Sequence, residues 1–430
     1  MRPIRPLVLA FVAALAFAGC TIDTINSFDP VPANVRAINL IYDAATIDVT
    51  SNGDVVFPGV TTEQVTAYRE FDAEQRGFAL RVNGSTSDAG RRDYVLNGDE
   101  RYTLVAYGTA AIPTTLIVPD LTSDPGSSNF RTRAINTVPT AAALDIYITA
   151  PNADITSLSP NINTLTYGST GVFNNFTAGS YQIRVTNYGT KTIVYDSGTV
   201  SLPGGTVSNM LLYTRGSGTL VNVALMETTG GAKTTILENT LARLRTVHVA
   251  NTTDGIDVYD SGRVGLFANV ATHSAAAYTT LAPGVRSLTV ELHAAPGTTI
   301  AAVDRTLRPA TDTTLYVSGD PGAFGAAALD DSNVSALSGQ ARLRLVNLTA
   351  DRTAVDLLAG DTVVASAVTP TAVPAYNEQA GGTYTLKARN TASQATIVTL
   401  DNAVLGSTQV YSAYVAGTVA QPTLTLVQDR

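Results

Sequence analysis

Alternating apolar and polar residues, in short runs separated by turn residues, fill the chain from about residue 34 onward. The runs are rich in Val, Ile, Thr and Tyr, and Gly, Asp, Asn and Pro stand between them. A period of two is typical of strands with one buried face, and the sequence shows no long stretch of helical periodicity. The pattern therefore predicts an all-β protein built from antiparallel strands.

One strand pattern occurs four times. It reads an apolar residue or Thr, then Arg, any residue, Ile or Val, and finally Asn or His, and an Asp follows twelve residues after each Arg. The four pairs are Arg36 with Asp48, Arg133 with Asp145, Arg245 with Asp257, and Arg344 with Asp356. Successive arginines are 97, 112 and 99 residues apart, the size of one β-sandwich of about seven strands and too long for a solenoid or propeller repeat. We expect four tandem immunoglobulin-like sandwiches.

The expected domains are residues 34–120, 130–227, 241–330 and 341–430. Between them the strand pattern lapses into Gly, Ser, Thr, Asp and Pro, over residues 121–129, 228–239 and 330–340. Such segments are typical linkers. On these linkers the four domains would stand as separate beads, in a rod-like stalk or a bent string.

The N-terminus has the features of a secretory signal. Arg2 and Arg5 give it a positive charge, and Leu7–Phe17 is an apolar run of eleven residues. A membrane-spanning helix needs about 20 apolar residues, so this run is too short to cross a bilayer alone. The pattern predicts a cleaved signal peptide over residues 1–19 and an exported protein.

Cys20, the one cysteine of the chain, directly follows this segment. The run Phe17-Ala18-Gly19-Cys20 resembles a bacterial lipobox. The resemblance implies that Cys20 becomes the N-terminal residue and carries several acyl chains, which together make a stable membrane anchor. A chance cysteine in an ordinary signal peptide is the alternative. Thr21, where Asp would favour the inner membrane, resembles lipoproteins forwarded to the outer membrane of a Gram-negative host, and residues 20–33 would be the lipidated tether.

Charge and cysteine content narrow the partners. The 27 Lys and Arg residues against 35 Asp and Glu give a net charge of −8, so no basic surplus is available to neutralise nucleic-acid phosphates. One cysteine allows no intramolecular disulfide. We expect the membrane as a partner through Cys20, an envelope protein or a glycan as a further partner, and no nucleic acid.

The repeated residues resemble a family of bacterial domains of unknown function, DUF4397. Residues 242–259 match its pattern best and read ARLRTVHVANTTDGIDVY, an Arg-containing strand that ends in His or Asn, a turn, and a strand with Asp, Val and Tyr. The resemblance covers all four repeats, although the Tyr is absent after Val49 in the first and is Leu358 in the fourth. It implies a secreted or lipidated protein with tandem immunoglobulin-type sandwiches and no assigned activity.

The repeated Arg and Asp are the first candidates for chemistry. If the strands that carry them form an antiparallel hairpin, each Arg lies opposite its Asp, as Arg36 would lie opposite Asp48. A cross-strand ion pair that is identical in four domains is a structural element, worth about 0.2 to 1 kcal/mol where it is exposed. We therefore predict no catalytic role for these pairs.

All three histidines, His248, His273 and His293, lie in the third repeat. His248 takes the place of an Asn in the other repeats, so we expect a side-chain hydrogen bond that stabilises a turn and that an amide or an imidazole can make. No His pair or acidic cluster completes a tetrahedral ligand set, and we predict no metal site and no cofactor. The sequence assigns no role to His273 and His293.

Enzyme motifs are absent from the sequence. It has no Gly-x-Ser-x-Gly elbow, no Gly-x-x-x-x-Gly-Lys phosphate loop and no His-Glu-x-x-His. The acidic pair Asp330 and Asp331 lies in linker sequence, and we interpret both as ordinary loop residues without a functional role. The leading hypothesis is a non-enzymatic, lipid-anchored envelope protein that presents its sandwiches for spacing, adhesion or partner binding. The alternatives are a carbohydrate-binding array, favoured by 18 Tyr and disfavoured by the lack of Trp, and a hydrolase.

Overall fold

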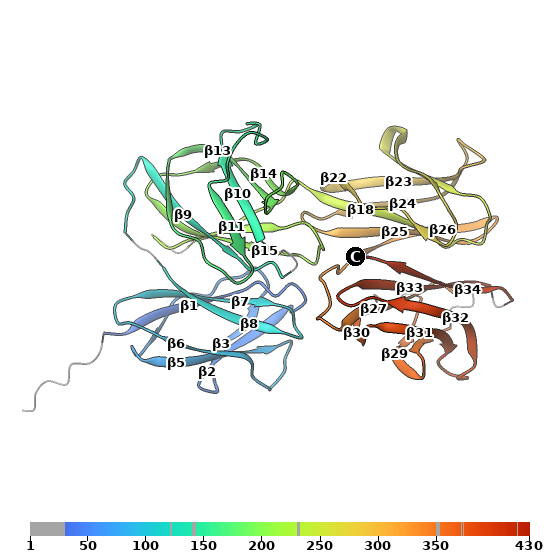
Figure 1. Ribbon diagram of the computed structural model, residues 1–430, viewed down its shortest axis with the longest axis horizontal. Coiled ribbons are helices and arrows are strands. Elements are labelled where there is room, and N and C mark those ends of the chain that lie inside the picture. Colours follow the sequence, from blue (N-terminus) through green and yellow to red (C-terminus); the bar gives the residue numbers. More distant parts are fainter. Residues whose placement is uncertain are drawn as a thin grey trace, which may run out of the picture.

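The computed structural model describes residues 31–120, 123–139, 143–229, 233–349, 353–370, 372, 374–418 and 420–430. These residues form 34 strands and one short 3₁₀ helix, Ser261–Arg263, and no helix among them is long and apolar enough to cross a membrane. The strands make eight sheets that pair into four β-sandwiches (Figure 1). The predicted all-β fold of four tandem sandwiches is confirmed.

In every domain one sheet contains the first strand and the other contains the second. The first domain has the orders β4-β1-β7-β8 and β3-β2-β5-β6, and the second has β12-β9-β15-β16-β17 and β11-β10-β13-β14. The strands of the first domain are β1 Ala33–Asn39, β2 Thr46–Ser51, β3 Asp54–Thr61, β4 Arg69–Phe71, β5 Gln75–Val82, β6 Ala89–Val95, β7 Arg101–Gly108 and β8 Pro113–Pro119. Those of the second are β9 Asn129–Asn136, β10 Ala143–Thr149, β11 Ile162–Thr166, β12 Asn174–Thr177, β13 Gly179–Asn187, β14 Ile193–Leu202, β15 Thr206–Tyr213, β16 Asn222–Glu227 and β17 Thr234–Leu237.

The third and fourth domains repeat this plan. Their sheets have the orders β21-β18-β25-β26, with β22 also on β18, and β20-β19-β23-β24, then β30-β27-β33-β34 and β29-β28-β31-β32. The strands of the third domain are β18 Ala242–His248, β19 Ile256–Asp260, β20 Val264–Val270, β21 Ser274–Ala275, β22 Thr279–Leu281, β23 Gly284–Leu292, β24 Thr299–Leu307, β25 Asp312–Asp320 and β26 Ala323–Asp331. Those of the fourth are β27 Gln340–Asn347, β28 Val355–Ala359, β29 Thr362–Val368, β30 Asn377–Ala380, β31 Gly382–Asn390, β32 Thr396–Leu405, β33 Val410–Gly417 and β34 Pro422–Gln428.

Each sandwich contains one parallel strand pair, which the sequence pattern did not predict. Strand β1 runs parallel to β7, and the same holds for β9 with β15, β18 with β25, and β27 with β33. The chain leaves the first strand for the opposite sheet, so the strand that later returns beside it can run in the same direction. The remaining pairings between named strands of the described chain are antiparallel, as expected.

Strand β1 is buried on both faces. Ala33, Val35 and Ala37 point into the core of the first sandwich, which also contains Leu80 of the opposite sheet. Ile38 points the other way and contacts residues of the second domain. The first strand of each domain thus lies between two hydrophobic cores, which stabilises both because apolar surface leaves water on each side.

The domains pack face to face in two pairs. One apolar cluster between the first and second domains includes Ile38 and Leu211, and another between the third and fourth includes Val247 and Tyr414. In each pair the contacting sheets are those that hold the parallel strands (Figure 1). The expectation of separate beads on a rod or string is therefore wrong, because the outer faces of these sheets are apolar too and are buried against each other.

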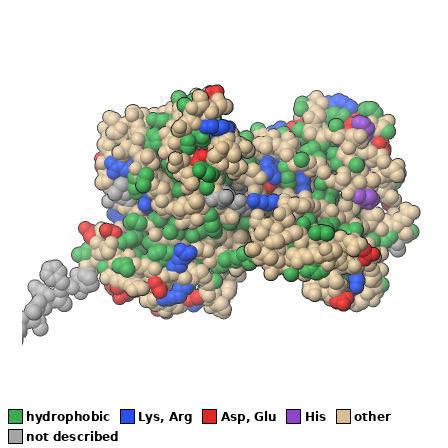
Figure 2. All heavy atoms as spheres, in the orientation of Figure 1, with side chains coloured by type: hydrophobic (Ala, Val, Ile, Leu, Met, Phe, Trp, Pro, Cys, Tyr) green, Lys and Arg blue, Asp and Glu red, His purple; other side chains and the backbone are tan. Residues whose placement is uncertain are grey.

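The two pairs are joined near the centre of the molecule. The Ser217 hydroxyl, in the loop after β15, donates a hydrogen bond of 2.7 Å to Asp312 of the third domain. The backbone N–H of Asn333 donates to the Gly216 carbonyl at 2.7 Å. The space-filling view shows the two pairs meeting at a narrower waist (Figure 2). The segment 228–239, expected to be only a linker, contains strand β17 and extends a sheet of the second domain.

Candidate functional site

The Asn or His that ends each repeated strand holds a turn, as predicted. Asn39 Oδ1 accepts the backbone N–H of Ile41 at 3.0 Å, and its Nδ2 donates to the Ala44 and Val60 carbonyls. His248 does the same with an imidazole, because Nδ1 accepts the N–H of Ala250 at 3.3 Å and Nε2 donates to the Asp254 carbonyl at 3.1 Å. Burial lowers the pKa of His248, so the neutral ring that can accept is the favoured form.

The repeated Asp does not pair with the repeated Arg. The two residues lie on strands of opposite sheets, for example Arg36 on β1 and Asp48 on β2, so the predicted antiparallel hairpin does not exist. A spacing of twelve residues fits a connection between two sheets as well as it fits a hairpin. The correction applies to all four pairs, Arg36/Asp48, Arg133/Asp145, Arg245/Asp257 and Arg344/Asp356.

Each of these aspartates instead caps a β-bulge. In every domain the strand register shifts opposite the Asp, so that two residues face it, and the second of the two has a left-handed backbone. The Asp carboxylate accepts the backbone N–H of that residue. The pairs are Asp48 with Gly59 (2.7 Å), Asp145 with Thr164 (2.9 Å), Asp257 with Asn269 (2.7 Å) and Asp356 with Ala367 (2.9 Å).

The repeated arginines lie at the interfaces between domains. In the second pair they exchange partners: Arg245 of the third domain forms an ion pair with Asp429 of the fourth, and Arg344 of the fourth with Asp331 of the third. All four side chains are at most 2% exposed. The interpretation of Asp330 and Asp331 as loop residues is wrong, because both lie in β26, and Asp331 faces the partner domain.

Hydroxyl groups complete this network. The second oxygen of each aspartate accepts from a Tyr and from a Thr or Ser of its own domain, namely Asp331 from Tyr278 and Thr314, and Asp429 from Tyr376 and Ser412. Burial raises the pKa of Tyr278 and Tyr376 well above the ordinary value, so these phenols stay protonated and donate. Each buried guanidinium also stacks on the Tyr ring of its own domain, at 4.8 Å for Arg245 and 4.6 Å for Arg344.

The first pair keeps this plan but lacks one acid. Thr228 and Phe173 occupy the places of Asp429 and Tyr376. Arg36 donates to the Glu227 carbonyl of the second domain at 3.0 Å and lies 3.5 Å from Asp120 of its own domain.

The side-chain amide of Asn209 links Arg133, the second arginine of this domain pair, to Asp120. Asn209 donates to Asp120 at 2.8 Å and accepts from Arg133 Nε at 2.7 Å. Burial lowers the pKa of Arg133, which forms no ion pair in the described part of the chain. The interface therefore holds two buried arginines and one aspartate.

A family model described as "Domain of unknown function (DUF4397)" matches residues 33–147 and 242–358. The chain belongs to this family. Each DUF4397 match begins at the first strand of a domain pair, covers one complete sandwich and continues into the second strand of its partner. The match thus crosses the interface that the arginines join.

Solved structures add little to this assignment. The Bacillus anthracis TIE protein is 7% identical with a TM-score of 0.15, over 86% of this chain and 66% of that one. A family 26 carbohydrate-binding module from Eubacterium rectale Amy13K, solved with maltoheptaose, is 9% identical with a TM-score of 0.16, over 48% of this chain and 96% of that one. Neither similarity bears on what this DUF4397 protein binds. A search of curated proteins finds no match.

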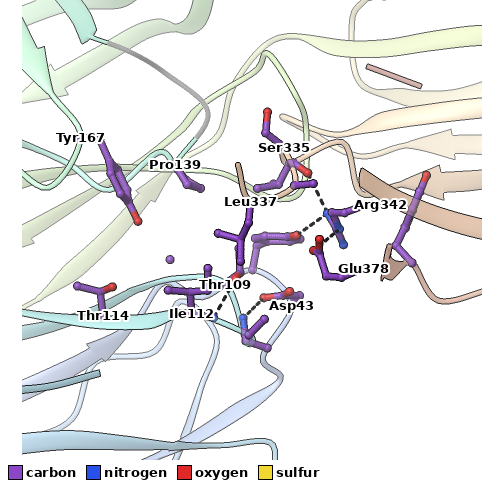
Figure 3. Close-up of a pocket in the computed structure, with 17 residues that line it drawn as sticks. Asp43, Thr109, Ile112, Thr114, Pro139, Tyr167, Ser335, Leu337, Arg342 and Glu378 are labelled. Carbon is purple, nitrogen blue, oxygen red and sulfur yellow. Dashed lines mark hydrogen bonds and ion pairs between the residues drawn. The ribbon is translucent and has the colours of Figure 1, made fainter. Parts of the chain in front are cut away.

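A hollow of about 470 Å³ lies where the first, second and fourth domains meet the segment that joins β26 to β27 (Figure 3). The turn after β1 contributes Tyr42 and Asp43, the β7–β8 hairpin contributes Ile112, and the second domain contributes Tyr167. The joining segment adds Leu337 among others, and the fourth domain adds Arg342, Tyr376 and Glu378. We call this site the junction pocket. Sequence reasoning could not find it, because apart from residues 334–337 and Arg342 its walls come from segments that are far apart in the chain.

Arg342 ties the wall of the junction pocket together. Its Nη1 donates to the Tyr42 hydroxyl at 3.2 Å and to the Val334 carbonyl at 3.0 Å. Its guanidinium carbon lies 5.0 Å from the centre of the Tyr376 ring. The Ser332 hydroxyl donates to Tyr42 at 3.0 Å. The first and fourth domains and the segment between β26 and β27 are thus held in one arrangement around the pocket.

The two histidines without an assigned role each contact another side chain, and Cys20 lies outside the described residues. His273 Nδ1 lies 3.0 Å from the Thr425 hydroxyl of the fourth domain, and His293 Nδ1 lies 3.0 Å from Asp257. No group of three or more His, Cys, Asp or Glu that could hold a metal ion is found among the residues described. Cys20, the signal peptide and nearly all of the tether lie outside them.

Proposed function

We propose that this DUF4397 protein is a non-enzymatic, lipid-anchored protein of the cell envelope that holds its four domains in one arrangement and binds a partner in the junction pocket. The observation that carries the proposal is the origin of the pocket walls, which come from three domains and the segment between β26 and β27. Binding in such a pocket requires the domains to be packed in one arrangement, whereas a simple spacer does not.

The residues that the four domains share support a binding rather than a catalytic role. The repeated Asp caps a bulge, the repeated Asn or His holds a turn, and the repeated Arg joins domains. These groups are committed to the fold. The proposed anchor rests on Cys20 and its lipobox-like context, which also favour export and, in a Gram-negative host, the outer membrane.

The test is photo-cross-linking on intact cells with a reactive amino acid at Leu337, on the rim of the junction pocket. The matched control carries it at Val404, which is also exposed but lies on β32, outside the pocket lining. We expect a discrete cross-linked partner from position 337 and none from position 404. Equal capture at both positions, or none at 337, would overturn the binding role.

The anchor is tested separately. Replacing Cys20 by Ala should move the protein from the membrane fraction to the soluble fraction and end the incorporation of a labelled fatty acid. Unchanged membrane association and labelling in C20A would remove lipidation from the proposal while leaving the pocket result intact.

A glycan is the second candidate partner, favoured by Tyr167 of the junction pocket, which is 40% exposed and offers its ring to a sugar. Affinity gels that contain soluble polysaccharides test it. A retarded full-length protein would support a carbohydrate-binding role, and unchanged migration in every gel would dismiss it.

A further inference from the structure

Three large apolar side chains are exposed at the rim of the junction pocket. Ile112, Tyr167 and Leu337 are 43%, 40% and 47% exposed, come from the first domain, the second domain and the segment between β26 and β27, and line the same pocket. Large apolar side chains that gather around one hollow mark a binding surface more often than scattered ones do. A ligand that covers them would bring an apolar body.

The charged groups of the pocket are one cation and two acids, Arg342, Asp43 and Glu378. Arg342 is committed to its own hydrogen bonds with Tyr42 and the segment between β26 and β27. Glu378 Oε1 lies 3.7 Å from Arg342 Nε, within ion-pair range, and forms no hydrogen bond within the described part of the chain. Asp43 accepts the backbone N–H of Ala110 at 2.7 Å and forms no ion pair there.

Arg342 is thus the one cation among the described lining residues that offsets the negative charge of the two carboxylates. Asp43 and Glu378 are partly exposed to solvent, and the partial loss of hydration in the pocket raises the pKa of both. A positive group placed between them would restore the lost stabilisation of the charged forms. A negative group would add to the repulsion.

A second hollow borders the junction pocket. It has a volume of about 740 Å³, and Tyr42 and Asp43 line it as well. Its other charged groups include Glu63 and Glu238, which hold Arg215 at 2.6 and 2.5 Å. Asp43 thus stands between two hollows, which suits an elongated ligand better than a compact one.

We propose that the junction pocket binds a basic, apolar peptide segment, in which a Lys or Arg side chain lies against Asp43 and Glu378 while neighbouring apolar side chains cover Ile112, Tyr167 and Leu337. This ligand class rests on the proposed function of the pocket as a partner site. It also agrees with the net charge of −8, which attracts cationic partners over a distance.

The experiment uses the purified full-length protein in detergent and three labelled hexapeptides, in which leucine alternates with lysine, glutamate or serine. Binding is followed by fluorescence anisotropy. The pocket variant is Asp43→Asn with Glu378→Gln, and the control variant is Glu70→Gln with Asp361→Asn, which makes the same change in charge at two exposed residues outside the pocket lining.

We expect saturable binding of the lysine peptide, about tenfold weaker binding in the pocket variant, and unchanged binding in the control variant. The glutamate peptide should not bind, and the serine peptide should bind more weakly than the lysine peptide. Leu337→Ser should also weaken binding, whereas Val404→Ser should not. Circular dichroism of each variant confirms that it is folded.

Several results would overturn the assignment. Equal weakening in the two charge variants would show unspecific attraction to an acidic protein, and tighter binding of the glutamate peptide would show that the sign is wrong. No saturable binding of the lysine peptide up to about 1 mM would exclude this ligand class, since that corresponds to less than about 4 kcal/mol. If cross-linking at position 337 still captured a partner, the binding role would stand with a different ligand, so the two failures are distinguishable.

Discussion

Arg344 of the fourth domain and Asp331 at the end of the third form an ion pair in which the two side chains are 2% and 0% exposed. Arg245 and Asp429 repeat the relationship in the opposite direction. Each of these domains therefore supplies the counter-charge for the other. Removing one of these acids while the interface stays formed would leave a buried arginine without its partner, which is far more costly than losing a surface ion pair.

We expect Asp331→Asn to lower the free energy of unfolding of the third and fourth domains by about 3 to 5 kcal/mol. The amide can still accept from Tyr278 and Thr314, but it leaves the charge of Arg344 uncompensated. Chemical denaturation of the full-length protein measures the effect. Asp361→Asn, which removes the exposed partner of Lys387, should leave the midpoint unchanged, and a similarly small effect at Asp331 would contradict the assigned role.

The first domain pair should gain stability when its missing acid is restored. Phe173→Tyr combined with Thr228→Asp would give Arg36 a carboxylate from the second domain, as Asp429 gives one to Arg245. We expect a gain of about 1 to 3 kcal/mol, the range for hydrogen bonds to charged groups. Phe173→Tyr alone should bring no gain, because it buries a hydroxyl without its acceptor. A double variant no more stable than this single one would show that the two pairs are not equivalent.

His248 should make stability depend on pH. Burial lowers its pKa in the folded state below the unfolded value of about 6.5, so the unfolded chain takes up the proton more readily. The free energy of unfolding should therefore fall as the pH drops below about 6.5. His248→Asn, which copies the other three repeats, should flatten the curve between pH 6.5 and 5, while His293→Asn should keep the fall. An unchanged curve in H248N would disprove the role of this ring.

The bulge of the fourth domain contains a strained residue. Ala367 has a φ of 52°, where the first domain has Gly59 at 59°. A left-handed backbone costs an L-residue about 1 to 2 kcal/mol. Glycine avoids this cost, but part of the gain is offset because glycine loses more conformational entropy on folding. We expect Ala367→Gly to stabilise the protein by about 0.5 to 1 kcal/mol in thermal or chemical denaturation. Ala302→Gly, at an exposed position of β24 without a left-handed backbone, should destabilise it instead.

The sequence predicted the repeated local structure well and the partners of charged residues poorly. The role of His248 followed from its place in the repeat, because an amide and an imidazole can make the same pair of hydrogen bonds. The pairing of Arg36 with Asp48 failed because a fixed spacing does not say whether the next strand stays in the same sheet. The local sequence pattern predicts that a strand forms, but only the topology of the sheets determines which strand lies next to it.

Two signals in the sequence pointed to the domain pairs. An Asp follows β8 and β34, at Asp120 and Asp429, and ends β26, at Asp331, whereas Thr228 follows the corresponding strand β16 of the second domain. The repeated strand also breaks strict alternation, since Ile38 follows directly after Ala37, which indicates burial on both faces. The junction pocket had no such signal, because its walls are assembled by packing between domains.

The exchange of arginines also sets an order of events while the chain is being synthesised. Strand β1 can pair with β7 only after β7 has been synthesised, and Arg36 lies 67 residues before its hydroxyl partner Thr103. Arg245 likewise lies 69 residues before its hydroxyl partner Thr314, but its acid partner Asp429 follows it by 184 residues. The third domain therefore cannot complete this network before the fourth has emerged, and we expect domains three and four to complete their folding as one cooperative unit.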